Sequence, residues 1–158
     1  MRESKERNPA NMSAIKIRLM KADDYKAVLR IDEKVFNVSR PEYYQMRFEK
    51  LVRSKDYVPA SLVAEENGTV VGFIMGELYI GEYGISQEKA TLDTIGVDPD
   101  HQGKGVGDQL IAEFIDHLRR LGVKKINTLV DWKDSRLIQF FSANSFSPSN
   151  IINLERSI

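Results

Sequence analysis

The stretch from Val97 to Gly107 constrains this chain more than any other, because it places alternating glycines between a strand-like run and a helix-like run. Glycine lets the main chain approach a ligand closely and adopt positive φ angles. The first N–H groups of a helix have no partner inside the helix and lie at the positive end of its dipole, so a phosphate or diphosphate satisfies them. The stretch therefore predicts an anion-binding turn, where Lys104 adds a positive charge.

Two phosphate-binding motifs do not match this turn. A P-loop requires glycine at the position of Asp98 and serine or threonine at the position of Gly105. The dinucleotide motif GxGxxG requires glycine where Asp108 stands. Both motifs are excluded, whereas an ordinary glycine-rich turn that binds nothing would need only one of the three glycines.

The remaining pattern is Gln102-x-x-Gly105-x-Gly107. It resembles the acyl-CoA diphosphate loop of the GNAT superfamily of N-acyltransferases, whose signature is Gln/Arg-x-x-Gly-x-Gly/Ala. The order of predicted elements over residues 15–158 also agrees with that family. The resemblance implies acetyl-CoA as cosubstrate and the following cofactor-binding residues: Ile95, Gly96, Val97, Gln102, Gly103, Lys104, Gly105, Val106, Gly107, Asp134 and Phe141.

Hydrophobic periodicity and turn residues predict the secondary structure. Alternation indicates strands, apolar residues at helical spacing indicate helices, and the Asn67-Gly68 pair indicates a hairpin. We expect strands at 15–19, 61–65, 70–80, 90–97, 125–130 and 151–155, and helices at 23–35, 43–52, 106–121 and 135–143. The order β-α-α-β-β-β-α-β-α-β predicts an α/β (α+β) fold, a mixed sheet flanked by helices.

Composition limits the class of protein. The length of 158 residues suits a single domain, which we place at 14–158 after a disordered leader at 1–13. Lys plus Arg and Asp plus Glu both number 23, which argues against a nucleic-acid partner. Cysteine is absent and histidine occurs twice, so we expect no metal site and a reducing cytoplasmic location. No apolar run approaches the length of a membrane span, so we expect no membrane partner.

The reaction that the resemblance implies is acyl transfer from a thioester to a primary amine. An amine with a pKa of about 10.4 must lose a proton before it attacks, which calls for a general base. Asp93 is the first candidate, because it shares a strand face with Ile95, and Glu77 on the preceding strand is the second. The structural alternatives are a solvated Asp93 and an outward-facing Glu77.

The resemblance also predicts how the strand before the loop contacts the cofactor. In GNAT proteins the pantetheine arm pairs with free main-chain groups of that strand, here Ile95, Gly96 and Val97. We expect a bulge at Gly96 that turns an N–H group toward the thioester oxygen. Ile95 and Val97 also suit a plain core strand.

The last predicted helix departs from the family pattern. Phe141 stands where many GNAT enzymes have a tyrosine acid, and a phenyl ring cannot donate a proton. Asp134 stands where an asparagine often binds the cofactor arm, although capping the helix is its more ordinary role. We expect Trp132 to pack against the sheet. The departure at Phe141 keeps open a non-catalytic acyl-CoA-binding regulatory module as an alternative. A nucleotide-phosphate binder that uses the same glycine-rich loop is a third alternative.

The acceptor site is expected between the helices at 23–52, the loop at 79–88 and the last strand. This region is aromatic and acidic, which suits a cationic amine, and its members are Tyr43, Tyr44, Glu77, Glu82 and Glu88. The partners predicted for this chain are thus acetyl-CoA and an amine acceptor. A homodimer is an expectation from the family resemblance alone.

Overall fold

A computed structural model describes residues 14–80 and 86–158 of the chain. The chain divides into two compact units, one that ends at Thr128 and one formed by Leu129–Ile158. The predicted leader at 1–13 and the acceptor residue Glu82 lie outside the described residues. The single domain at 14–158 stays a prediction.

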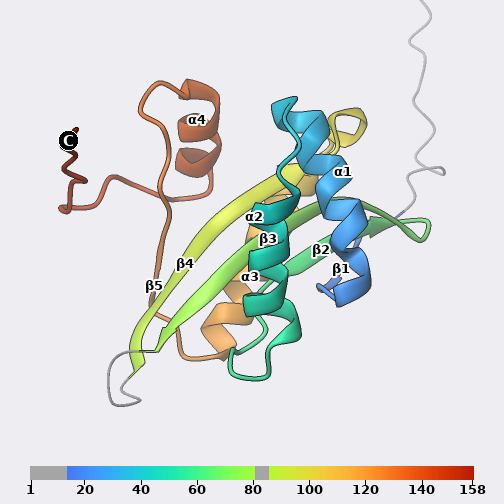
Figure 1. Cartoon of the computed structure of the whole chain (residues 1–158), viewed down its shortest axis with the longest axis horizontal. Helices are drawn as coiled ribbons and strands as arrows, with labels where there is room; N and C mark the ends of the chain where they lie inside the picture. Colours follow the sequence, from blue (N-terminus) through green and yellow to red (C-terminus); the bar gives the residue numbers. More distant parts are fainter. Residues whose placement is uncertain (1–13, 81–85) are drawn as a thin grey trace, which may run out of the picture. The chain divides into compact units, whose positions relative to one another are not determined.

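The first unit contains a sheet whose described strands run in the order β1-β2-β3-β4-β5 (Figure 1). The first four strands pair antiparallel, and β5 pairs parallel to β4, which confirms a mixed sheet. The strands are β1 (Lys16–Leu19), β2 (Leu62–Glu66), β3 (Thr69–Ile80), β4 (Ser86–Val97) and β5 (Lys125–Asn127).

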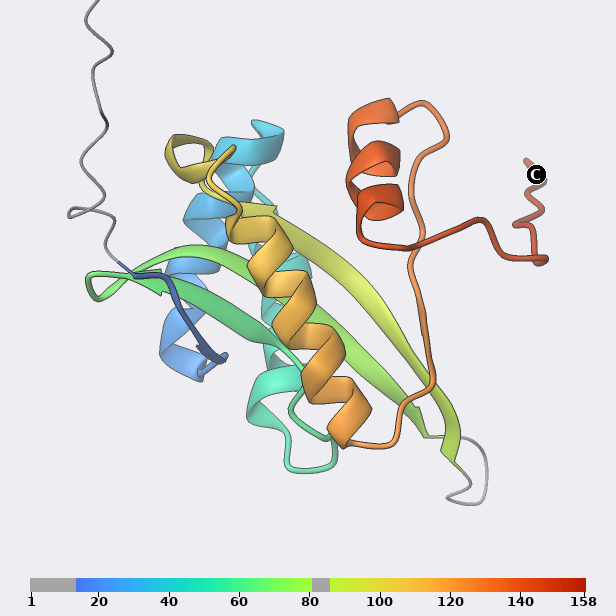
Figure 2. The same ribbon diagram turned by 180° about the vertical axis from the view of Figure 1, so that it is seen from behind.

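Helices cover both faces of this sheet, as a sheet with two apolar faces requires. The helical segments are η2 (Ala22–Asp24), α1 (Tyr25–Phe36), α2 (Pro41–Phe48), the π-helical η3 (Glu49–Arg53), η5 (Pro99–His101) and α3 (Val106–Arg120). Helices α1 and α2 lie on one face, and α3 crosses the other (Figures 1 and 2). Helix α1 ends at Asn37, which adopts a left-handed φ of 54°, and Gly122, just after α3, has a φ of 84°.

Each face of the sheet has its own buried core. On the α1 and α2 face, the Tyr44 ring meets the Phe73 ring edge-on at 6.0 Å, and both side chains are fully buried. On the α3 face, Phe114 is fully buried, and a Cβ atom at Gly76 would lie only 2.4 Å from its ring. Each such large apolar side chain contributes roughly 1.5–3 kcal/mol by leaving water.

The predicted hairpin between β2 and β3 is confirmed. Asn67 and Gly68 adopt φ angles of 50° and 80°, the values a tight two-residue turn needs. The predicted strand boundaries differ elsewhere, since β4 begins at Ser86 and β5 ends at Asn127. β4 extends further because its first residues pair with the far end of β3, which local sequence does not show.

The bulge expected at Gly96 is wrong. Gly96 lies directly opposite Phe73 in regular register, and an added Cβ would come within 2.7 Å of the Phe73 ring. The register shifts further along the strand, where Met75 pairs with Thr94 and Gly76 pairs with Leu92. Asp93 is therefore the extra residue of β4, and the glycine serves close packing instead.

The second unit contains one helix among its described residues, α4 (Ser135–Ala143). The Asp134 carboxylate accepts a hydrogen bond of 3.0 Å from the Leu137 N–H group, which confirms the N-cap. The strand expected at 151–155 is wrong, because these residues carry no strand pairing in the structure. Trp132 belongs to this second unit, and its packing against the sheet stays a prediction.

No helix within residues 14–80 and 86–158 is both long enough and apolar enough to cross a membrane.

Candidate functional site

The loop between β4 and α3 has the backbone conformation that its glycines predict. Gly103 and Gly105 adopt φ angles of 73° and 79°, and a Cβ atom at either position would meet nothing within 4 Å. Glycine is thus required here by conformation and not by crowding. Gly105 is also the N-cap of α3, and no side chain caps this helix end.

The loop presents a row of unused donors. Among the described residues, no acceptor is recorded for the main-chain N–H groups from Gly103 to Gly107. Helix α3 is fifteen residues long, so its dipole adds a partial positive charge at the same place. The exposed Lys104 contributes a full charge within the loop. The arrangement suits a diphosphate, which accepts several hydrogen bonds and carries negative charge.

Side chains hold the beginning of the loop in place. The Gln102 side-chain amide donates to the Val97 carbonyl oxygen at 3.0 Å, so it braces the turn. The buried Asp98 carboxylate accepts from the Asp100 N–H group at 3.1 Å and lies 2.9 Å from the Lys34 ammonium. Burial alone would raise the pKa of Asp98, but Lys34 and the Asp100 N–H group hold that pKa below its usual value.

Within the described residues of the first unit, no strand pairs with one edge of β4 just before the loop. Strand β5 pairs only with Lys89, Ala90 and Thr91. The Asp98 N–H group donates to the Val71 carbonyl at 2.8 Å, so alternation along the antiparallel pair turns the main-chain groups of Ile95 and Val97 away from β3. These groups face the open edge, whereas those of Gly96 face β3.

Asp93 lies at the bulge of β4 within a cluster of four charged side chains, called here the charged cluster: Arg47, Lys50, Glu77 and Asp93. The Arg47 guanidinium lies 3.2 Å from Asp93 Oδ2 and 3.9 Å from Glu77 Oε2. The Lys50 ammonium lies 2.7 Å from Glu77 Oε1. The structure thus brings the two predicted base candidates together, each beside a cation.

The two carboxylates of the charged cluster differ in their surroundings. Only 12% of the Asp93 side chain is exposed, and its buried Oδ2 has no hydrogen-bond partner in the described part of the chain. Burial raises the pKa of Asp93 above its usual value, Arg47 opposes that rise, and Glu77 adds to it. Asp93 therefore remains the better base candidate, because a raised pKa favours proton uptake near neutral pH.

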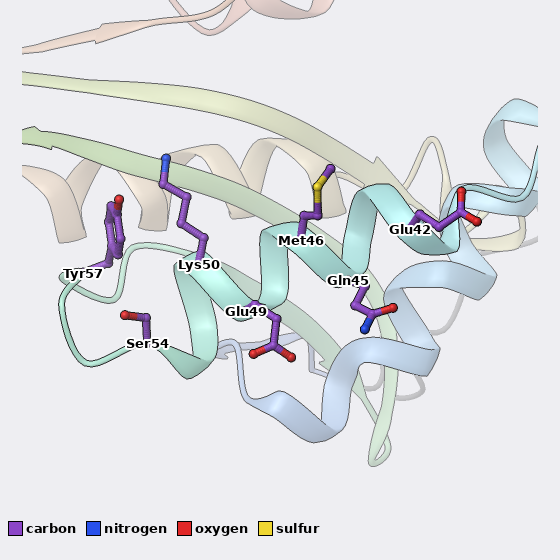
Figure 3. A pocket seen from close by; sticks show the side chains of 7 residues that line it. All are labelled: Glu42, Gln45, Met46, Glu49, Lys50, Ser54 and Tyr57. Atoms are coloured by element: carbon purple, nitrogen blue, oxygen red, sulfur yellow. The ribbon is translucent and has the colours of Figure 1, made fainter.

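An open hollow of about 600 Å³ lies on the surface of α2 and η3. Figure 3 shows Lys50 extending toward the strands while Glu49 points away from them. The residues that line the hollow are Glu42, Gln45, Met46, Glu49, Lys50, Ser54 and Tyr57. None of the predicted cofactor-binding or catalytic residues is among them, so the hollow is not the predicted cofactor site.

Several residues expected at the acceptor site have other partners. The buried Tyr44 hydroxyl donates to Asp32 at 2.7 Å, and Glu88 pairs with the Lys124 ammonium at 2.8 Å. The Tyr44 hydroxyl and the Glu88 carboxylate therefore already have protein partners.

Two predicted cofactor-binding residues belong to the second unit. Asp134 caps α4, and the buried Phe141 ring packs 5.5 Å from Phe140 and 5.1 Å from Phe146. Their assignment to the cofactor stays a prediction.

Sequence reasoning missed Arg47 and Lys50. Tyr43, Arg47 and Lys50 recur at the spacing of one helix face, a signal that was available within the predicted helix at 43–52. Which residues this helix face contacts depends on the packing of α2 against β3 and β4, and no local sequence pattern reveals that packing.

Comparisons with known proteins agree with the fold. The sequence model of the "Acetyltransferase (GNAT) family" matches residues 25–146. The chain is 31% identical over 130 residues to mycothiol acetyltransferase of Propionibacterium freudenreichii subsp. shermanii, covering 79% of this chain and 40% of that protein. It is 28% identical over 146 residues to an acetyltransferase of Pectobacterium atrosepticum, covering 91% of this chain and 96% of the relative.

A solved structure is similar as well. The crystal structure of a GNAT family acetyltransferase from Brucella melitensis in complex with acetyl-CoA superimposes with a TM-score of 0.61 at 28% identity. The similarity covers 80% of this chain and 82% of that chain. The chain spans less than half the length of the mycothiol acetyltransferase it matches, and nearly all of the Pectobacterium relative.

Proposed function

Because the chain belongs to the GNAT acetyltransferase family, we propose that it transfers an acetyl group from acetyl-CoA to a primary amine by direct attack of the amine on the thioester. The chain is an acyltransferase, and acetyl-CoA is its cosubstrate. The observation that carries the proposal is the row of main-chain N–H groups from Gly103 to Gly107 at the start of α3, which have no acceptor in the part of the chain that the structure describes.

In this proposal the loop binds the diphosphate of acetyl-CoA. Main-chain N–H groups donate to its oxygens, while the helix dipole and Lys104 offset its negative charge. The pantetheine arm runs along the open edge of β4, where the main-chain groups of Ile95 and Val97 are turned outward. The thioester then lies along β4 between the loop and Asp93.

The chemical step forms one bond and breaks another. The acceptor ammonium gives a proton to Asp93, and the neutral amine nitrogen bonds to the thioester carbon. The carbon–sulfur bond breaks, and its electron pair leaves with the coenzyme A sulfur. The nitrogen, now bonded to the acetyl carbon, gives its second proton to the departing thiolate, so the products are the amide and the coenzyme A thiol. A thiol with a pKa of about 8.5 leaves as a thiolate without a strong acid, so a tyrosine at the position of Phe141 is not essential.

The variant Gly107→Glu tests the loop. Gly107 lies within α3, so a side chain is compatible with its backbone, but a carboxylate there repels a diphosphate. We expect coenzyme A affinity to fall on the order of 100-fold, equivalent to about 2.7 kcal/mol. Isothermal titration calorimetry measures this change, with ATP and NAD as competing ligands.

The matched control for that test is Ala112→Glu, which adds the same charge to an exposed position further along α3. The influence of the helix end fades within its first turn, so the control should bind coenzyme A normally. Equal affinities for both variants would remove the loop from the proposal. Tighter binding of ATP than of coenzyme A by the unchanged protein would favour the nucleotide-phosphate binder.

A second candidate function is a non-catalytic acyl-CoA-binding regulatory module. It is favoured by Phe141, which is buried in an aromatic cluster with Phe140 and Phe146 and offers no proton. Thiol release from acetyl-CoA, measured across peptide, polyamine and small-molecule amines, separates the two functions. Turnover with any amine supports the enzyme, and tight acetyl-CoA binding without turnover across the panel supports the module.

The acceptor is proposed only as a primary amine on a protein, a peptide or a small molecule. A cytoplasmic location and a homodimer complete the proposal, the first from the absence of cysteine and the second from the family resemblance.

A further inference from the structure

The charged cluster joins four elements at one position of the sheet. Asp93 is the bulged residue of β4, Glu77 belongs to β3, Arg47 to α2 and Lys50 to η3. A bulged residue is free of the regular alternation of its strand, so its side chain can be directed differently from its neighbours. Here the Asp93 carboxylate meets the Arg47 guanidinium.

The two carboxylates of the charged cluster differ in the cations beside them. Lys50 lies 2.7 Å from Glu77, which leaves Arg47, at 3.2 Å, as the nearest cation to Asp93. Arg47 does not complete a hydrogen bond with the buried Asp93 Oδ2, which has no hydrogen-bond partner among the described residues. The contact is therefore electrostatic, and it leaves that oxygen able to accept a proton.

We infer that Arg47 is a positioning residue for the proposed acetyl transfer, which keeps the Asp93 carboxylate ionised and oriented so that it can accept the acceptor's proton. This inference rests on the proposed function. In the proposed reaction Arg47 contacts neither the acceptor nor the cofactor, and it acts only through Asp93.

Opposing effects act on the protonation of the Asp93 carboxylate. Burial and the nearby Glu77 carboxylate both favour the protonated form of Asp93, which could no longer act as a base. Arg47 and, more weakly, Lys50 favour the ionised form. Removing Arg47 leaves only the weaker effect of Lys50 to oppose burial and Glu77, so the pKa of Asp93 rises and the base is lost over a wider pH range.

The test compares Arg47→Met with the unchanged protein in two measurements. The acid limb of the kcat/KM profile should move up by about one pH unit, since an adjacent arginine lowers a carboxyl pKa by roughly 1–3 units. Carbon-13 NMR titration of the Asp93 carboxyl should show a shift of the same direction and size. Activity at pH values above the shifted limb should largely recover.

Two further variants serve as controls for Arg47→Met. Arg53→Met removes a cation from η3, the segment that follows α2, where the partner of Arg53 is Glu49. This variant should leave both the acid limb of the kcat/KM profile and the Asp93 titration unchanged. Arg47→Lys restores the charge and should return the acid limb most of the way toward its original position. If Arg47→Met does not fold, Arg47→Gln serves in its place with the same expected shift.

An unchanged acid limb and an unchanged Asp93 titration in a folded Arg47 variant would overturn the inference. Failure of the proposed function is a separate result, because it appears as absent thiol release by the unchanged protein. The NMR titration needs no acceptor, so it tests the Arg47 contact even in that case.

Discussion

The loop before α3, proposed to bind a diphosphate, and the charged cluster are built in opposite ways, although Asp93 of the cluster lies on the strand that leads into the loop. The loop uses consecutive main-chain N–H groups, set by the left-handed φ angles of Gly103 and Gly105. The charged cluster uses side chains that converge from four elements upon the bulge at Asp93. A motif of six residues can specify the first kind of site, whereas the second exists only once the sheet register is set.

The two regions also differ in their proposed roles, since the loop binds the cofactor and the charged cluster takes part in the reaction. Main-chain donors at a helix start hold an anion whatever follows, but they offer no group that accepts a proton from an amine. In the proposed reaction the charged cluster supplies that group as Asp93. Variants of one region should therefore leave the property of the other nearly intact.

The largest expected effect comes from Asp93→Asn, which keeps the shape of the side chain and removes the base. We expect turnover to fall by at least about 100-fold, the usual contribution of a general base. Acetyl-CoA affinity should change less than about twofold, because the diphosphate loop is untouched. Steady-state thiol release and calorimetry on the same preparation check both values, and a turnover equal to that of the unchanged protein would exclude Asp93 as the base.

A smaller effect is expected at Gly96, which lies on β4 between the two regions. Gly96→Ala should reduce the free energy of unfolding by about 1–3 kcal/mol, because the new Cβ would overlap the Phe73 ring. Urea unfolding measures this loss. A double-mutant cycle with Phe73→Leu supplies the control, since a smaller side chain should relieve part of the cost. An equal cost in both backgrounds would contradict the packing role of Gly96.

The smallest effect is expected at Asp98, which links the loop to α1. Asp98→Ala should reduce the free energy of unfolding by about 1 kcal/mol at pH 7, because the Asp100 N–H group loses its cap. The pKa of Asp98 is lowered in the folded protein, so its ionised form contributes stability above the unfolded-state pKa of about 3.9. That contribution is lost as the pH falls below about 4, and the gap between the two proteins should narrow there.

The control at this position is Asp98→Asn, because asparagine can keep the cap while losing the charge. Its stability should fall less than that of the alanine variant at pH 7. Thermal unfolding between pH 3 and pH 7 compares the three proteins. A gap that stays constant down to pH 3 would show that the Asp98 charge does not stabilise the loop.

The sequence by itself determined the features that depend on neighbouring residues. Asn67-Gly68 specifies a hairpin because both residues tolerate positive φ, and the apolar spacing from Val106 onward specifies α3. The glycines before α3 specify the loop for the same local reason. The mixed sheet followed from the order of these elements, and membership of the GNAT family confirms it.

Only the tertiary structure decided the features that depend on pairing between distant segments. The register of β3 against β4 places the bulge at Asp93 and the Phe73 ring over Gly96, and the packing of α2 brings Arg47 to Asp93. The apolar run at 151–155 forms no strand, because a strand exists only through hydrogen bonds to a partner. Residue spacing determines a local conformation, but which side chains meet is decided by contacts between segments far apart in the chain.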